Sequence, residues 1–371
     1  MSKDKLIIQK LLDSAEVTIN GNKDYDIQVH NDAFYGRVLQ QGTLGLGESY
    51  MEGWWDCEHL DQFFHKVMLA DLEKQIKGDW DVMIKIASKL IFSAGHKSRS
   101  FEIGKKHYDI GNDLYKIMLD KRLSYTCGYW QNAKNLDAAQ DAKLDLVCRK
   151  IGLQKGQKVL DIGCGWGSFV GYAAQNYSAD AIGITVSKEQ KKLADELYKN
   201  LHVKIKLQDY RDINEKFDHI VSIGMFEHVG HQHHRTYMKV AHQALNEDGL
   251  FLLHTIGGNL TSNSIEPWIN KYIFPGGDIP SITQISTAIE GLFVIEDLHN
   301  FGTNYDKTLM AWCQNFEKGW DQLSSNYTEQ FHRMWRYYLL SCAGAFRARK
   351  MQLWQIVLSK NGVPGGYKSV R

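Results

Sequence analysis

The stretch Val159–Gly167, with the sequence VLDIGCGWG, constrains the fold of this chain more than any other. A short apolar run that ends in glycine is typical of a buried strand. The residues that follow it, SFVGYAAQNY, have helical spacing, so the glycines lie in a strand-to-helix turn. Because glycine has no Cβ, a ligand can lie directly against the main chain there, at the N-terminus of the helix.

The spacing of these glycines indicates which ligand the turn binds. A dinucleotide-binding turn has the pattern G-x-G-x-x-G, with an acidic residue about 20 positions later. Here the pattern is D-x-G-x-G-x-G, which resembles the first motif of Rossmann-like class I methyltransferases that use S-adenosylmethionine (SAM). The next expected strand, DAIGITVS, ends in Thr185 and lacks the carboxylate that a nicotinamide cofactor needs. An ordinary tight glycine turn is the alternative.

Apolar segments alternate with helical ones beyond this turn, as KVLDIG, DAIGITVS, KIKLQDY, FDHIVSIGMFEHVG and GLFLLHTIG. This alternation predicts an α/β fold with a parallel, doubly wound sheet, in which ligands bind at the carboxyl ends of the strands. Asp209 follows the third of these strands, Glu227 ends the fourth and His254 ends the fifth. We therefore expect Glu227 and His254 at one edge, beside the glycine turn. A helix cap and a core histidine are the alternative roles.

The first 95 residues are predicted to form a small, mostly helical domain for lipid binding or dimerisation, and residues 100–371 the SAM-dependent methyltransferase domain with an acyl-chain pocket. KLIIQKLLDSA has helical spacing, and VTINGNKDYDIQVH suggests a hairpin around Asn20 and Gly21. Residues 80–95 suggest a helix with one apolar side. Such a helix is a packed core or dimer element, or it lies on a membrane surface.

The charge of the chain excludes some partners. Its 44 basic and 43 acidic residues nearly cancel, so no overall field favours nucleic acid. Two zones are locally basic: residues 85–106 hold six basic residues and one acidic, and residues 330–371 hold eight basic residues and no acidic ones. These zones suit an anionic membrane surface, although an ordinary solvated face is an equal alternative.

The expected location is the cytoplasm, with peripheral binding to the inner face of the membrane. No apolar stretch approaches the roughly 18 residues that a membrane span needs. The six cysteines are scattered without a C-x-x-C pair, which is typical of a reducing compartment. The run His228, His231, His233 and His234 lacks a matching cysteine pair to complete a zinc site, so no metal is expected.

Several strings along the chain carry a family resemblance. The chain resembles the bacterial cyclopropane-fatty-acyl-phospholipid synthases over nearly its whole length, and the mycolic acid cyclopropane synthases over its catalytic part. The strings are LQQGTLGLGESYMEGWWDC, HYDIGNDLY, VLDIGCGWG, QDYRD, GMFEHVG, LLHTIG, EPWINKYIFP, NFGTNYDKTLMAW and CAGAFRAR. The N-terminal part is typical of the phospholipid branch.

This resemblance implies two sets of site residues. The set that contacts SAM is Tyr125, Thr126, Val159, Leu160, Asp161, Ile162, Gly163, Cys164, Gly165, Trp166, Gly167, Gly183, Thr185, Val186, Gln190, Gln208, Asp209 and Tyr210. The set that holds a bicarbonate ion is Cys127, Glu227, His254 and Tyr305, and Cys342 is a further candidate catalytic residue. The chain departs from the family at Thr126, where serine is commoner, but the hydroxyl is kept.

The resemblance also implies the reaction, which converts the cis double bond of an unsaturated acyl chain in a membrane phospholipid into a cyclopropane. Closing the ring releases a proton, and a carboxylate buried against lipid is a costly base. We therefore expect bicarbonate as the base, with Glu227 and His254 orienting it and Tyr305 donating to it. A nucleophilic Cys342 would risk methylation, so a pocket wall is its favoured role.

Two other interpretations remain open. One is a SAM-dependent lipid C-methyltransferase or hydroxylating relative that forms no ring. The other is a non-enzymatic SAM-binding lipid module, which would have no use for Glu227 and His254 at the strand ends. The expected partners are unsaturated phospholipids of anionic membranes and a second copy of the chain.

Overall fold

A computed structural model describes residues 2–71, 111–262 and 265–371 of the chain. The chain divides into two compact units. Unit 1 comprises Met1–Met118, Ile265–Gly276 and Leu309–Lys350, and unit 2 comprises Leu119–Ser264, Gly277–Thr308 and Met351–Arg371. The predicted helix 80–95, the basic zone 85–106 and the predicted boundary near residue 95 lie outside the described residues or reach beyond them. The division into domains 1–95 and 100–371 therefore stays a prediction.

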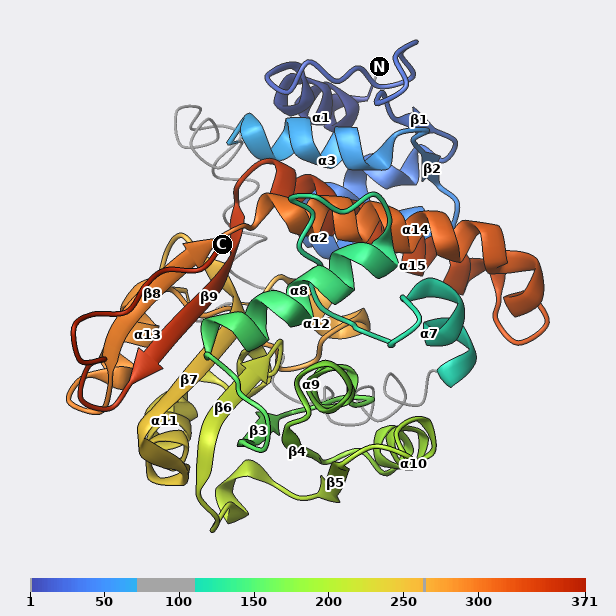
Figure 1. Cartoon of the computed structure of the whole chain (residues 1–371). Coiled ribbons are helices and arrows are strands. Elements are labelled where there is room, and N and C mark those ends of the chain that lie inside the picture. The colour runs from blue at the N-terminus through green and yellow to red at the C-terminus, as the bar shows by residue number, and fades with distance from the viewer. Residues whose placement is uncertain (1, 72–110, 263–264) are drawn as a thin grey trace. The chain divides into compact units, whose positions relative to one another are not determined.

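A seven-stranded sheet forms the centre of unit 2 (Figure 1), in the order β5-β4-β3-β6-β7-β9-β8. Its strands are β3 (Lys158–Ile162), β4 (Asp180–Thr185), β5 (Val203–Leu207), β6 (Phe217–Ile223), β7 (Leu245–Gly258), β8 (Val294–Asn300) and β9 (Met351–Ser359). Strands β3 to β7 pair in parallel, whereas β9 runs antiparallel between β7 and β8. The predicted Rossmann-like α/β fold is confirmed.

Helices cover both faces of this sheet, because alternate side chains of a strand point to opposite faces and both sets are apolar here. On one face, α8 (Leu136–Lys150) and α9 (Ser168–Tyr177) pack on residues such as Val159 and Val221. On the other, α11 (His234–Ala244) and α13 (Ile282–Ile289) pack on residues such as Ile162 and Leu253. The shorter elements of unit 2 are α10 (Lys188–Leu197), η1 (Tyr210–Asp212), η2 (Phe226–His228) and η3 (His231–His233).

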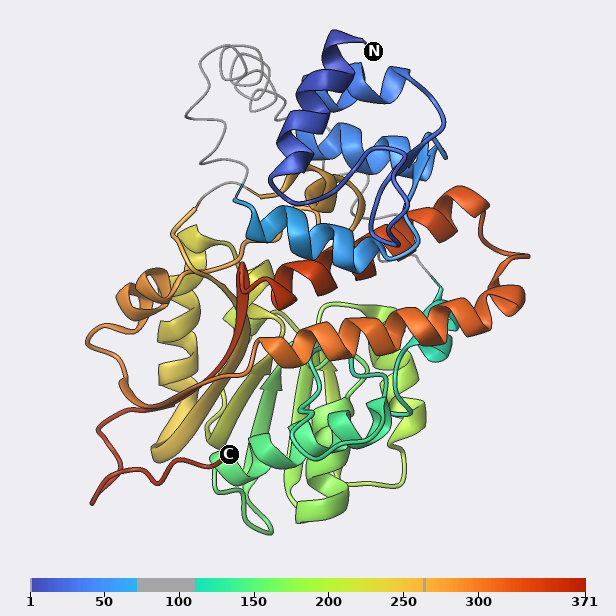
Figure 2. The same ribbon diagram turned by 90° about the horizontal axis from the view of Figure 1, so that it is seen from above.

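Unit 1 is mostly helical. It contains α1 (Lys3–Asp13), α2 (Ala33–Met51), α3 (Leu60–Leu69), α7 (Asn112–Met118), α12 (Pro267–Tyr272) and α15 (Glu329–Arg347), with β1 (Gln28–Val29) and β2 (Trp55–Asp56). The long helix α14 (Thr303–Leu323) begins in unit 2 and ends in unit 1. Helix α3 lies along α15 in both views (Figures 1 and 2). Gly344 permits this close approach, because a Cβ there would lie 2.7 Å from Cβ of Phe64.

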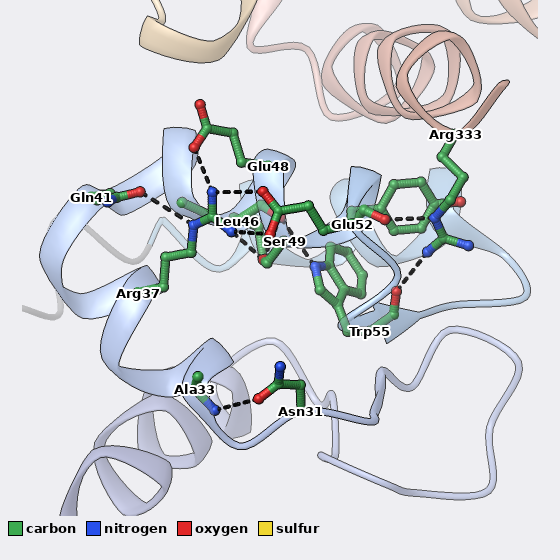
Figure 3. Close-up of polar contacts among 12 residues, drawn as sticks. Asn31, Ala33, Arg37, Gln41, Leu46, Glu48, Ser49, Glu52, Trp55 and Arg333 are labelled. Carbon is green, nitrogen blue, oxygen red and sulfur yellow. Dashed lines mark hydrogen bonds and ion pairs between the residues drawn. The ribbon is translucent and has the colours of Figure 1, made fainter. Parts of the chain in front are cut away.

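Charged side chains of unit 1 stack on its aromatic core. The guanidinium of Arg333 lies 4.2 Å from the ring centroid of Tyr50 and donates to the carbonyls of Tyr50 and Trp55 (Figure 3). In the same view, Arg37 pairs with Glu48 and Glu52 at 2.6 and 2.7 Å. Arg333 thereby satisfies a carbonyl in the last turn of α2 and one in β2, whereas the partners of Arg37 are carboxylates.

The predicted hairpin around Asn20 and Gly21 is wrong. β1 pairs antiparallel with β2, about 27 residues further along the chain, and not with the segment before it. Polar side chains organise residues 18–29 instead: Asp26 accepts a hydrogen bond from the Thr18 backbone at 2.8 Å, and Asn20 accepts one from Val29 at 2.7 Å. Such side-chain bonds compete with strand pairing.

Candidate active site

The glycine turn that follows β3 adopts a backbone conformation that is unfavourable for residues with a Cβ. Gly163, Gly165 and Gly167 have φ of +84°, +55° and +84°, all in the left-handed region. The Gly163 and Cys164 N–H groups donate to the carbonyl of Ile184 at 3.0 and 2.9 Å, which fixes the turn against β4. At Gly165 an added Cβ would meet no atom within 4 Å, so there is open space above the turn.

Asp161, in β3, provides a buried acceptor next to this turn. Its side chain is 2% exposed, and its Oδ1 has no hydrogen-bond partner among the described residues. Burial raises the pKa of this carboxyl to about 7, although the nearby Lys143 opposes the shift. A buried acceptor without a partner is costly unless a ligand satisfies it. The turn and Asp161 together fit the amino-acid end of SAM.

The predicted SAM residues of β4 and α10 lie together. Thr185 ends β4, as predicted, and its hydroxyl donates to Oε1 of Gln190 at 2.8 Å. Its carbonyl accepts from the backbone of Gln208, just past β5, at 3.0 Å. Val186, the next residue, is 76% exposed. At Gly183 an added Cβ would lie 2.7 Å from Sγ of Cys164, so glycine is needed where β4 meets the turn.

The remaining members of the predicted SAM set differ in what they can offer. Asp209 follows β5 and caps η1, and both of its carboxylate oxygens bond the guanidinium of Arg211, which lowers the pKa of this carboxyl. Tyr210 packs on Tyr237 with ring centroids 5.0 Å apart. The side chains of three further members face the hydrophobic core, so only their backbone atoms can reach a ligand. These residues are Val159, Leu160 and Ile162. Trp166 is also buried.

The loop with Tyr125, Thr126 and Cys127 reaches the carboxyl end of β6. A Cβ added to Gly224, the residue after β6, would lie 2.5 Å from Cγ2 of Thr126. Two side chains of α8 hold this loop: Gln140 donates to the carbonyl of Thr126 at 2.7 Å, and Lys143 donates to its hydroxyl at 2.9 Å. Neither was predicted, although both are polar residues on an otherwise apolar helix face.

Glu227 lies in η2, since β6 ends four residues earlier at Ile223, and not at the strand end as predicted. Its Oε1 accepts a hydrogen bond from the backbone of Ile256 at 2.6 Å, and its own carbonyl accepts one from Asp278 at 2.7 Å. Oε2 has no partner within the part of the chain that is described. Burial raises the pKa of this carboxyl to about 7.

His254 lies inside β7, and the prediction that it ends this strand is wrong. It pairs with Ile223, the last residue of β6, but β7 continues to Gly258 because β9 pairs with it from the other side. Only the tertiary structure supplies that second neighbour. The side chain is 1% exposed, and burial, followed by the charges of Lys143 and Lys150, holds the pKa of the ring well below its usual range.

Gln355 of β9 sets the tautomer of His254. The amide Nε2 of Gln355 lies 3.2 Å from Nδ1 of the ring. An amide N–H only donates, so Nδ1 accepts and the proton of the neutral ring is on Nε2. Nε2 has no hydrogen-bond partner among the residues that the structure describes. The site therefore contains a buried N–H donor for a ligand. Gln355 was not predicted, although a glutamine within the apolar run LWQIVL is a signal.

Cys127 and Tyr305 belong to the same unit, and Cys127 contacts Thr308 on the helix that carries Tyr305. The Thr308 hydroxyl lies 3.8 Å from Sγ of Cys127, and Tyr305 is three residues earlier on α14, on the same helix face. Both predicted residues are buried, and burial raises the pKa of the Cys127 thiol well above its usual range. The ring of Phe301, just before α14, packs edge-on to His254 with centroids 5.9 Å apart.

Cys342 lies on α15 in unit 1, whereas the other four predicted catalytic residues lie in unit 2. Burial raises the pKa of its thiol to about 12, so the group is a thiol at neutral pH. Its role stays a prediction.

In the histidine run, His231 pairs with Asp278 at 2.8 Å and His234 stacks on Phe226 with ring centroids 4.2 Å apart. Across the described ranges, no three His, Cys, Asp or Glu residues are placed to hold a metal ion.

Comparison with known proteins decides the family. The family model described as mycolic acid cyclopropane synthetase matches residues 95–356. The chain belongs to this family. It is 51% identical over 365 residues to the cyclopropane-fatty-acyl-phospholipid synthase of Escherichia coli K12, an alignment that covers 98% of this chain and 95% of that protein. It is also 39% identical to a probable fatty acid methyltransferase of Pseudomonas putida, with 95% and 91% covered.

Solved structures agree with this assignment. The cyclopropane synthase MmaA2 from Mycobacterium tuberculosis matches 72% of this chain and 100% of its own, with a TM-score of 0.66 and 31% identity. The mycolic acid cyclopropane synthase CmaA1 complexed with SAH and CTAB matches 70% and 98%, with a TM-score of 0.65 and 31% identity. SAH is the form of SAM that remains after methyl transfer. The chain is thus a SAM-dependent methyltransferase of the cyclopropane synthase family.

Proposed function

We propose that this enzyme transfers the SAM methyl group, as a methylene bridge, to the cis double bond of unsaturated acyl chains in membrane phospholipids. The observation that carries the proposal is the 51% identity to the phospholipid synthase of Escherichia coli, which extends over 98% of this chain. The mycolic acid enzymes cover only about 70% of it. Similarity over the N-terminal segment therefore favours a phospholipid substrate.

The proposed role of the chain around SAM follows from its polar groups. SAM supplies an electrophilic methyl group when it is bound. The glycine turn leaves room for the amino-acid end, and Asp161 Oδ1 accepts from its ammonium. Thr185 ends β4 and bonds Gln190 of α10, where the ribose is expected, and Asp209 lies beyond β5, where the adenine is expected. These assignments are supported by where the residues lie and by the resemblance of their motifs.

The proposed base is a bicarbonate ion, which supplies a proton-accepting oxygen when it is bound. Two buried atoms fit such an ion: Nε2 of His254 is an N–H donor, and Oε2 of Glu227 is an acceptor for its hydroxyl, both without a described partner. Cys127 and Tyr305 complete the set that the family resemblance implies. Because His254 is neutral, it donates without losing its own proton. Bicarbonate has both an oxygen that can accept from the neutral His254 ring and a hydroxyl that can donate to the Glu227 carboxylate. A fully ionised anion has no hydroxyl to donate to that carboxylate.

The chain also contains a group that can stabilise the positive charge that develops on the acyl chain during ring closure. Phe301, packed on His254, is an aromatic ring within the same cluster. Aromatic faces and a nearby anion stabilise positive charge when water is excluded. Orientation of the double bond accounts for much of the remaining barrier.

Peripheral membrane binding is proposed for only one of the two basic zones. Six of the eight basic side chains in residues 330–371 form ion pairs with acidic ones, which are Arg333, Arg336, Arg347, Lys350, Lys360 and Arg371. Their charge is largely balanced, so we assign peripheral binding to residues 85–106. No helix in the described ranges is long and apolar enough to cross a bilayer. A second copy of the chain, joined through residues 1–95, is also proposed.

The decisive experiment incubates the enzyme with labelled SAM and vesicles of monounsaturated phosphatidylglycerol and phosphatidylethanolamine. Expected are one added CH₂ by mass, loss of the vinyl protons and appearance of ring protons by proton NMR. Vesicle binding that is insensitive to salt would count against an electrostatic contribution.

A second candidate function is C-methylation without ring closure, favoured by the 39% identity to a probable fatty acid methyltransferase. Methyl addition with loss of one vinyl proton also adds one CH₂, so NMR separates it from ring formation. Binding of SAM and vesicles without any product would instead support the non-enzymatic module.

A further inference from the structure

Lys143, on α8, is a buried lysine next to the predicted SAM site. Its side chain is 1% exposed, and its Nζ donates to Oγ1 of Thr126 at 2.9 Å. It lies within electrostatic range of Asp120, Cys127 and Asp161. A lysine is almost never fully buried unless its charge has a partner, yet no carboxylate lies within 4 Å of Nζ among the described residues.

The bond to Thr126 determines how that hydroxyl behaves. A lysine ammonium has donors and no acceptor, so Oγ1 of Thr126 must accept. The hydroxyl hydrogen of Thr126 is then available to donate to another group. Thr126 lies against Gly224 at the carboxyl end of β6, and β6 pairs with β3, which leads into the glycine turn. An oriented, charge-assisted donor is therefore held beside the turn.

Asp161 provides a hydrogen-bond acceptor, whereas Thr126 provides a donor. Its Oδ1 is a buried acceptor without a described partner, and Lys143 is the cation whose charge acts on it. Thus a buried acceptor in β3 and a half-buried donor at the carboxyl end of β6 belong to neighbouring strands of the sheet. The amino-acid end of SAM is a zwitterion, with an ammonium that needs an acceptor and a carboxylate that needs a donor. The two groups match these needs.

We infer that Lys143 is a positioning residue that orients the Thr126 hydroxyl to bind the carboxylate of SAM and balances the charge of that carboxylate. The inference rests on the proposed placement of SAM at the glycine turn, and it is independent of the lipid product. It explains why a lysine lies on a buried helix face. It also explains why the departure from serine to threonine at position 126 is tolerated, since either residue supplies the hydroxyl.

The test compares two ligands that differ only in the carboxylate, SAH and decarboxylated SAH, by calorimetry on the full chain. K143M should weaken SAH binding at least about tenfold, the loss expected for a charge-assisted hydrogen bond. It should leave decarboxylated SAH within about twofold. T126V should show the same selectivity and T126S should restore SAH binding. The combined K143M/T126V loss should be smaller than the sum of the two, because the residues act as one unit.

The matched control is K150M, on the same helix. Lys150 is also buried, but its Nζ contacts His299 at 3.2 Å and Asp297 at 3.6 Å, and it should not affect ligand selectivity. Equal loss for both ligands in K143M and T126V, or no loss in either, would overturn the inference. If K143M does not fold, the T126V and T126S pair decides. Wild-type SAH binding without cyclopropane product would reject the proposed function alone.

Discussion

The carboxylate of Glu227 accepts a hydrogen bond at 2.6 Å from the backbone N–H of Ile256, two residues beyond His254. This bond fastens the turn after β6 to the neighbouring strand β7. One oxygen of the carboxylate is occupied, and the other has no described partner. The site thereby combines a fixed acceptor from one element with a neutral donor, His254, from the next.

The first prediction concerns catalysis by Glu227. Replacing it with Gln keeps an oxygen that can accept from Ile256 but removes the negative charge. We expect kcat to fall at least about 100-fold, because a group that orients a base contributes on that scale. SAH affinity should change little. Product formation and calorimetry measure the two effects, and full turnover by E227Q would remove this residue from the mechanism.

The second prediction concerns the pH dependence of stability. Burial raises the pKa of Glu227 from 4.5 to about 7, so the folded state holds this proton more tightly than the unfolded state. Stability should therefore fall as pH rises from about 4.5 to 7, by on the order of 3 kcal/mol, and then level off. E227Q removes this cost, so its melting temperature should exceed that of the wild type at pH 8.

That advantage should shrink as the pH falls towards 4.5 and vanish below about pH 3.5, where the carboxyl is protonated in both states. E58Q is the matched control, because Glu58 is exposed. Its melting temperature should follow the wild type at every pH. Equal pH profiles for E227Q and the wild type would show that Glu227 is not buried as described.

The third prediction concerns the His254 tautomer. Q355L removes the donor to Nδ1, so the Nε2–H form loses its preference over the other neutral tautomer. Turnover should fall about tenfold or more, since a general acid–base network contributes on this scale or above. SAH binding should persist. Nitrogen-15 shifts of the labelled imidazole report the tautomer directly, and Q352L on the same strand is the control, since Gln352 bonds Asn259 instead. An unchanged tautomer in Q355L would contradict the prediction.

The fourth prediction concerns the glycine turn. Gly163 and Gly156 both have strongly positive φ, +84° and +79°, but only at Gly163 would a Cβ meet a neighbour, Cγ of Met225 at 2.4 Å. G156A should lose about 1 kcal/mol from backbone strain alone. G163A should lose more and also bind SAH more weakly. Denaturant unfolding and calorimetry make the comparison, and similar behaviour of both variants would mean that the turn tolerates a side chain.

The fifth prediction separates two cysteines. C342S should keep near-full activity, because the thiol on α15 is protonated at neutral pH and its predicted role is a pocket wall rather than a nucleophile. C127S should reduce turnover, since Cys127 belongs to the proposed bicarbonate set. Initial rates at several bicarbonate concentrations measure both, and a higher bicarbonate requirement in C127S but not in C342S is expected. An inactive, folded C342S would restore the thiol as a catalytic candidate.

The sequence by itself determined the features that are encoded locally. The glycines of the turn after β3, the alternation of strands and helices, and Thr185 at the end of β4 were all predicted. Each depends on residues close in sequence: a left-handed φ favours glycine, and burial on both faces of a strand produces an apolar run. The family motifs are local strings as well, so the amino-acid sequence is sufficient to indicate SAM chemistry.

Only the tertiary structure decided what completes the site. Gln355 lies 101 residues from His254, and pairing with β9 extends β7 beyond the predicted strand end. Lys143 meets Thr126 because α8 packs on the sheet, and the basic side chains near the C-terminus find acidic partners elsewhere in the chain. Sequence periodicity reports which face of an element is buried, but not which distant polar group that face will meet. That choice depends on how the strands pair and how the helices pack.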